Sequence, residues 1–157
     1  MNELQQKPQL NIPVVIGSAF IPSDFRIGNY VQSKEWKGIA QIEGIEILKD
    51  RIDFKVKGYI HSIIEGKYFD LEKITLTDEL IQKLGFKRFE SDGVVGFDSF
   101  EPEEKTIWYD KGKFTIVQWG ENTPFFFSNH NLRIELKFVH QLQNLFYAVE
   151  CSELSLS

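Results

Sequence analysis

The 157-residue sequence has a single cysteine, no excess of basic residues and no long apolar run. Cys151 has no second cysteine to pair with, so nothing in the chain indicates an oxidising compartment. The 18 Lys and Arg residues are outnumbered by 23 Asp and Glu residues, and the resulting net charge of −5 disfavours nucleic acid as a partner. No segment reaches the roughly 20 apolar residues that cross a bilayer as a helix. These absences predict a cytoplasmic protein without a membrane segment.

What the chain does contain is material for one hydrophobic core. Apolar residues make up 42% and aromatic residues 14% of the sequence, and a chain of this length buries about 70% of the surface that its unfolded form exposes. Residues 1–23 are polar at first and interrupted by prolines, which predicts an N-terminal tail or an edge strand. Residues 24–157 are expected to form a single α+β domain, with any subdomain boundary near 72–76.

Short β-strands dominate the predicted structure. In Arg51–Lys57 the apolar side chains alternate with charged ones, which is typical of a strand with one buried face. Asp110–Lys113 is the clearest hairpin turn. The other predicted strands share short apolar patterns between turn residues: 14–21, 25–31, 39–48, 59–64, 67–71, 86–89, 94–97, 106–109, 114–119 and 132–136. We therefore expect a curled antiparallel sheet or a small barrel.

Two helices complete an α+β fold that is mostly β. The first, at about 77–84, has Thr77 as its N-cap, acidic residues in its first turn and Gly85 at its C-terminal end. The second, at about 137–149, is amphipathic and should pack on the sheet. Its apolar stripe recurs at helical spacing and consists of Phe138, Val139, Leu142, Leu145, Phe146 and Val149.

Three segments together resemble a group of uncharacterised small proteins from Bacteroidetes genomes, phages and mobile elements. They are Phe25–Val31 (FRIGNYV), Leu76–Phe86 (LTDEL followed by KLGF) and Phe138–Ala148 (FVHQLQNLFYA). That group typically has RIGNYV, PLTEE with LLKLGF, and YVHQLQNLYFALTG; here Thr75 replaces the usual proline, and Cys151-Ser152 replace Thr-Gly. The resemblance implies a cytoplasmic protein of phage or mobile-element type. It implies roles such as binding a host factor, inhibiting a defence system or forming a minor part of a particle, and it carries over no biochemical activity.

The polar side of the second helix is the first candidate site. His140, Gln143, Asn144 and Tyr147 share this side, where a solvated helix would normally carry Lys and Glu. Their imidazole, amide and phenol groups would hydrogen-bond a ligand or a partner's backbone if they were accessible. In the alternative interpretation they satisfy buried strand ends or loop carbonyls, because a buried polar group without a partner costs about 1–3 kcal/mol.

A second candidate is Phe126, within the run Phe125–Phe127. Such a run places side chains on both faces of a strand, so it belongs to the core unless an exposed edge makes it a partner site. Trp36, Trp108 and Trp119 could likewise stack nucleic-acid bases, if a small barrel brought them beside basic residues of 49–57. The acidic residues between Glu90 and Glu104 lack the spacing of a calcium loop and are expected to be solvated.

The sequence contains no catalytic or metal-binding motif. The three histidines are not spaced as metal ligands, and nothing around Cys151 indicates an activated thiolate. We therefore predict a non-enzymatic module that binds another protein, without a cofactor. Two alternatives stay open: a protein that sequesters a small molecule on the polar side of the second helix, and a nucleic-acid-binding barrel.

Overall fold

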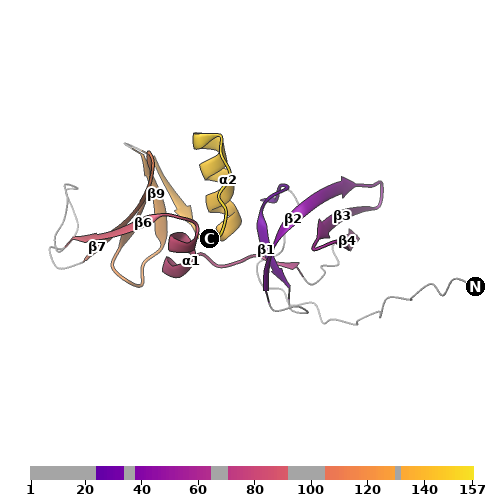
Figure 1. Ribbon diagram of the computed structural model, residues 1–157, viewed down its shortest axis with the longest axis horizontal. Helices are drawn as coiled ribbons and strands as arrows, with labels where there is room; N and C mark the ends of the chain where they lie inside the picture. The colour runs from indigo at the N-terminus through magenta and orange to yellow at the C-terminus, as the bar shows by residue number, and fades with distance from the viewer. Residues whose placement is uncertain (1–23, 34–37, 65–70, 92–104, 130–131) are drawn as a thin grey trace, which may run out of the picture.

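Two five-stranded antiparallel sheets form the body of the protein in the computed structural model, which describes residues 24–33, 38–64, 71–91, 105–129 and 132–157 (Figure 1). The first sheet has the order β4-β3-β2-β1-β5 and the second the order β10-β9-β8-β7-β6. The strands are β1 Tyr30–Ser33, β2 Gly38–Ile47, β3 Arg51–Val56, β4 Tyr59–Ile64, β5 Leu71–Glu72, β6 Lys87–Ser91, β7 Thr106–Lys111, β8 Phe114–Trp119, β9 Phe125–Asn129 and β10 Leu132–Leu136.

Two-residue turns set the register of the hairpins. Gly112-Lys113 joins β7 to β8, so the predicted turn at 110–113 is confirmed. Lys57 and Gly58 join β3 to β4 with φ values of 50° and 77°, the left-handed conformation that matches the twist of the strands it connects. The Lys49-Asp50 turn between β2 and β3 is closed by a hydrogen bond of 2.8 Å from the Leu48 N–H to the Arg51 carbonyl.

The short helix α1, Asp78–Lys83, has the predicted caps. The Thr77 hydroxyl accepts a hydrogen bond of 3.3 Å from the Leu80 N–H, which satisfies one of the free donors in the first turn. Gly85 follows the helix with φ of 86°, a conformation that side chains disfavour. Buried Ile81 anchors the helix, and the chain passes from the first sheet to the second through it.

The C-terminal helix α2, Val139–Glu150, lies between the two sheets (Figure 1). Val139, Leu142 and Phe146 of its predicted apolar stripe are buried against the second sheet. Val149 is 46% exposed, so the stripe fades in the last turn of the helix. The start of α2 is held to the segment between β5 and α1, because the Val139 N–H donates to the Ile74 carbonyl at 2.9 Å.

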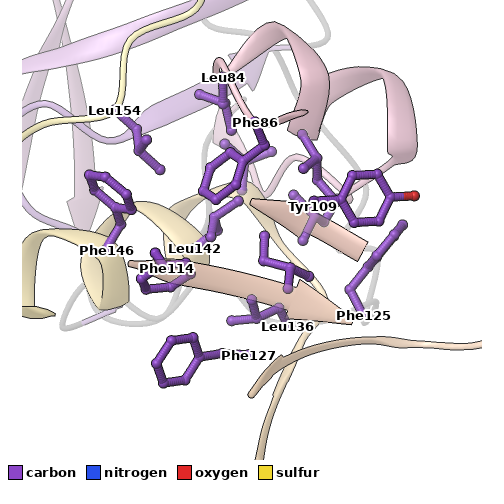
Figure 2. Close-up of a cluster of buried hydrophobic side chains, with 14 of the residues drawn as sticks. Leu84, Phe86, Tyr109, Phe114, Phe125, Phe127, Leu136, Leu142, Phe146 and Leu154 are labelled. Carbon is purple, nitrogen blue, oxygen red and sulfur yellow. The ribbon is translucent and has the colours of Figure 1, made fainter. Parts of the chain in front are cut away.

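The larger core, which we call the main core, fills the space between the second sheet, α1 and α2. Figure 2 shows its side chains converging from all three elements. The ring of Phe146 from α2 lies 5.2 Å from that of Phe114 and 5.9 Å from that of Phe86. Leu154, beyond the end of α2, is fully buried in the same core, so the C-terminal residues also contribute to it.

A second, smaller core covers one face of the first sheet. Its members alternate along the strands: Phe25, Val31, Ala40, Ile42, Phe54, Val56, Ile63 and Leu71. Strand β1 belongs to both cores, because successive side chains point to opposite faces. Val31 lies in the small core and Tyr30 in the main core. Strand β1 therefore lies between the two cores and contributes side chains to both.

The α+β, mostly β fold class is confirmed, with one refinement and one correction. The described strands form two separate sheets, so the small-barrel alternative is wrong. The predicted strand at 25–31 begins only at Tyr30, because residues 26–29 form a turn in which the Asn29 N–H donates to the Arg26 carbonyl. The strands predicted at 14–21 and 94–97, and most of the one at 67–71, lie outside the described residues. Among the described residues, no helix is long and apolar enough to cross a membrane.

Truncating the α2 anchors tests the main core. Leu142→Ala and Phe146→Ala should each lower the free energy of unfolding by about 2–5 kcal/mol, because each leaves a cavity among buried side chains. Val149→Ala on the same helix is the matched control and should change it by no more than about 0.5 kcal/mol. Urea denaturation followed by circular dichroism measures all three. Equal effects at positions 142 and 149 would show that α2 packs through a different side.

Candidate functional site

Gln143, at the centre of the polar side of α2, is fully buried against the turn that precedes β1. Its Oε1 atom accepts a hydrogen bond of 2.8 Å from the Tyr30 N–H. Its Nε2 atom donates to the Gly28 carbonyl at 3.1 Å and to the Leu154 carbonyl at 3.5 Å. One side chain thus satisfies backbone groups of the first sheet and of the C-terminal residues.

Asn144 extends the same contact. Its Oδ1 atom accepts hydrogen bonds of 2.9 Å from the Nδ2 of Asn29 and 2.9 Å from the Nε of Arg26. Its Nδ2 atom donates to the Asp24 carbonyl at 2.9 Å. Every polar atom of the Asn144 amide is therefore engaged by the segment 24–29.

Arg26 completes this arrangement from the side of the turn. Its guanidinium pairs with Glu153, with a hydrogen bond of 2.9 Å from Nη2 to Oε2, and Nη2 also donates to the Gln143 carbonyl at 3.2 Å. Its Cζ atom lies 4.4 Å from the centre of the Tyr147 ring, a cation–π contact. We call Arg26, Asn29, Gln143, Asn144 and Glu153 the polar junction. It joins the first sheet to α2.

His140 lies one turn before Gln143 and is 2% exposed. Its ring is 4.4 Å from that of Phe25 and 5.6 Å from that of Phe138, and its Nδ1 atom has no hydrogen-bond partner among the described residues. Burial, together with the nearby charge of Lys73, lowers the pKa of His140 to about 4, although Asp24 opposes the shift. The imidazole is therefore neutral at physiological pH.

The four candidates on α2 lie together; the amides of Gln143 and Asn144 and the ring of His140 point toward the protein. The hydrogen bonds of Gln143 and Asn144 are those that the structural interpretation of this face requires. Tyr147, 46% exposed, is the one side chain of the four with substantial access to solvent. Phe126 is far from them in the fold, because α2 packs on the face of the second sheet that bears Phe125 and Phe127.

Phe126 points to the opposite face of the second sheet, which we call the outer face. There the strand register aligns Phe89, Trp108, Val117 and Phe126 in one row across four strands. Trp119 lies beside the row, with its ring 5.1 Å from that of Phe126 and 5.0 Å from the Arg133 guanidinium carbon. We call Phe89, Trp108, Val117 and Phe126 the aromatic row; these neighbouring side chains form an apolar strip across the outer face.

The aromatic row is accessible to different degrees along its length. Phe89 at the β6 end is 49% exposed, Trp108 and Phe126 are partly exposed, and Val117 in the middle is buried between them. Neither helix covers this face, because the buried residues of α1 and α2 belong to the main core on the other side. Glu135 of β10, next to Phe126, is the charged residue at the far end of the row.

The two features needed for base stacking are not brought together. Trp108 and Trp119 are on the second sheet, whereas Arg51, Lys55 and Lys57 are on the first, and Trp36 lies outside the described residues. Of the acidic residues from Glu90 to Glu104, only Glu90 is described, and it pairs with Arg88 and Lys105. No group of three or more His, Cys, Asp or Glu residues in the described ranges is placed to hold a metal ion.

No protein-family model, curated protein or solved structure matches the chain. Sequence reasoning missed Arg26, Asn29 and Glu153 as partners of the α2 amides, although Phe25–Val31 and Phe138–Ala148 both stood out in the sequence. The aromatic row was missed because its register depends on how β6, β7 and β9 align across connections of different length.

The polar junction predicts a stability effect for Gln143→Leu. Leucine keeps the volume but leaves the buried Tyr30 N–H without its partner and removes one of the two side-chain donors to the Gly28 carbonyl, so the free energy of unfolding should fall by about 1–3 kcal/mol. Glu150→Leu, which introduces leucine at a partly exposed position of α2, is the control and should change it by no more than about 0.5 kcal/mol. A fully stable Gln143→Leu protein would contradict the structural role of this amide. Thermal and urea unfolding provide the comparison.

Burial of neutral His140 predicts acid sensitivity. The unfolded chain binds a proton near pH 6.5, whereas the folded protein does so only near pH 4, so the unfolded state holds more protons between these values. The free energy of unfolding should therefore fall by about 2 kcal/mol between pH 7 and pH 5. Urea titrations across this range should show the loss, and His140→Phe should reduce it. The control His61→Gln leaves His140 in place and should retain the loss. If the free energy of unfolding depends on pH in His140→Phe as it does in the wild type, the effect belongs to another group.

Proposed function

We propose that the protein is a non-enzymatic interaction module that binds another protein through the outer face of its second sheet. The observation that carries the proposal is the aromatic row, in which Phe89, Trp108 and Phe126 line up in register on the face opposite the main core. Contiguous apolar surface on a soluble domain marks an interaction site. Aromatic residues are enriched at the buried centre of protein interfaces, and charged residues are depleted there.

The composition of this face favours a protein partner over the alternatives. The members of the row are uncharged, and the charged residue next to its β9 end, Glu135, is acidic. The nearby Arg133 already contacts Trp119. The row therefore lacks the line of basic side chains that would bind a nucleic-acid backbone. The small-molecule alternative depended on Gln143 and Asn144, whose amides are engaged in the polar junction. The resemblance to phage and mobile-element proteins adds the proposal that the partner is a bacterial host factor, a defence component or a particle protein encountered in the cytoplasm.

Site-specific photo-crosslinking tests the outer face directly. Benzoylphenylalanine is placed at position 89 or 126 of the full chain, the bacterial host is irradiated, and adducts are identified by mass spectrometry. Because both positions belong to the aromatic row, we expect the same partner to be captured from both.

The matched control carries the photo-crosslinker at Ile47, an apolar side chain that is 78% exposed at the tip of the first sheet. That site should give no adduct with the same partner. Adducts at position 47 in the absence of adducts at 89 and 126 would move the interaction surface to the first sheet and contradict the proposal.

A further inference from the structure

Strand β6 forms an edge of the second sheet, and its backbone hydrogen-bonding groups can be assigned to one side or the other. Lys111 and Phe114 flank the two-residue turn between β7 and β8, so they form a hydrogen-bonded pair. Such pairs alternate along an antiparallel ladder, which makes Trp108 of β7 bond toward β6 rather than toward β8. Its partner in the register is Phe89.

The same alternation settles the other residues of β6. Lys87 and Ser91 are two positions from Phe89, so their N–H and C=O groups also face β7. The N–H and C=O groups of Arg88 and Glu90 point the opposite way, to the open edge. No described strand lies beyond β6 to receive them. An edge with two donors and two acceptors at this spacing is a template for another strand.

The side chains of Arg88 and Glu90 do not take part in this template. Arg88 pairs with Asp78 of α1 at 3.3 Å and with Glu90, and Glu90 also pairs with Lys105. These charges are thus held by ion pairs within the protein, while the backbone of the same two residues remains available at the edge.

The side chains on the outer side of β6 indicate what kind of strand fits there. Phe89, 49% exposed, is the last member of the aromatic row, so an apolar side chain from an added strand would lie against it and extend the row by one strand. Lys87 is exposed and has no ion-pair partner among the described residues, so an acidic residue suits the neighbouring position. In the added strand, the residues between the apolar and the acidic one would point to the opposite face of the sheet, where polar side chains suit.

We propose that the partner binds by adding an extended segment to the β6 edge, with apolar side chains continuing the aromatic row and an acidic residue near Lys87. Main-chain hydrogen bonds to Arg88 and Glu90 hold such a segment, and Phe89 and Trp108 select its alternate side chains. This inference rests on the proposed function, because it names how a partner reaches the same face.

The test uses amide hydrogen exchange of the full chain, measured by NMR, with a defined probe. The probe is the acetylated and amidated heptapeptide Thr-Val-Thr-Phe-Thr-Asp-Thr, which in an antiparallel pairing places Phe opposite Phe89 and Asp opposite Lys87 on the same face. In the control peptide, Pro replaces the two Thr residues that flank Phe, because their N–H groups would bond to β6. At peptide concentrations up to about 1 mM, we expect the Arg88 and Glu90 amides to exchange at least about ten times more slowly with the probe and to be unaffected by the control peptide.

A pair of variants isolates the backbone. Glu90→Pro removes the outward N–H at a position where an edge strand tolerates proline, while Glu90→Ala removes the same ion pairs and keeps the N–H. Protection of the Arg88 amide by the probe should persist in Glu90→Ala and disappear in Glu90→Pro. If the proline variant fails to fold, the wild-type exchange measurement alone decides.

Three results overturn the proposal that another protein adds a strand at the β6 edge. One is that the probe leaves the Arg88 and Glu90 amides unprotected. A second is that it perturbs Phe126 and Trp119 alone, which would mean docking on the face and not at the edge. The third is a wild-type dimer that Glu90→Pro dissociates, because the occupant would then be a second copy. Photo-crosslinked adducts at position 126 would leave the proposed function standing in the first two cases, whereas their absence would remove it as well.

Discussion

The contact on which the architecture depends is the hydrogen bond between the buried amide of Gln143 and the backbone of Tyr30. Strand β1 contributes to both cores, with Val31 in the small core and Tyr30 in the main core, so its position fixes one sheet relative to the other. A fully buried amide in an otherwise apolar interface is costly unless its groups are satisfied. Here it accepts from one strand and donates to the turn before it, which ties α2 to a single register along β1.

This constraint also explains what the polar side of α2 is for. Amides can donate and accept at once, whereas Lys and Glu would bring charges into a buried interface. Asn144 and Arg26 repeat the principle at the rim, where the guanidinium reaches Glu153 and the Tyr147 ring. The C-terminal residues close the arrangement, because Leu154 enters the main core and the Leu156 N–H donates to the Tyr30 hydroxyl at 2.9 Å. With α2 committed to this role, the surface that we propose for a partner is the aromatic row on the far side of the second sheet.

Local signals in the sequence were sufficient for most of the elements, although they placed β1 at 25–31 instead of Tyr30–Ser33 and did not define β9. Thr77 and Gly85 bracket α1 because capping chemistry is a property of a few neighbouring residues, and the alternation in Arg51–Lys57 reports a strand for the same reason. The pairing of the sheets was beyond such signals. Nothing near Gln143 in the sequence indicates that its partners are residues 28 and 30, more than 100 positions away, and Phe126 could be assigned to a face only once the strands around it were in register.

Native-state hydrogen exchange of the Tyr30 amide tests most directly whether the polar junction holds the two sheets together. If the Gln143 amide holds β1 against α2, the Tyr30 amide should exchange only through global unfolding, with the same protection and denaturant dependence as the amide of Ile116 in the middle of the main core. Exchange of Tyr30 through a much smaller local opening, while Ile116 stays protected, would show that the first sheet separates from α2 on its own and would contradict the account.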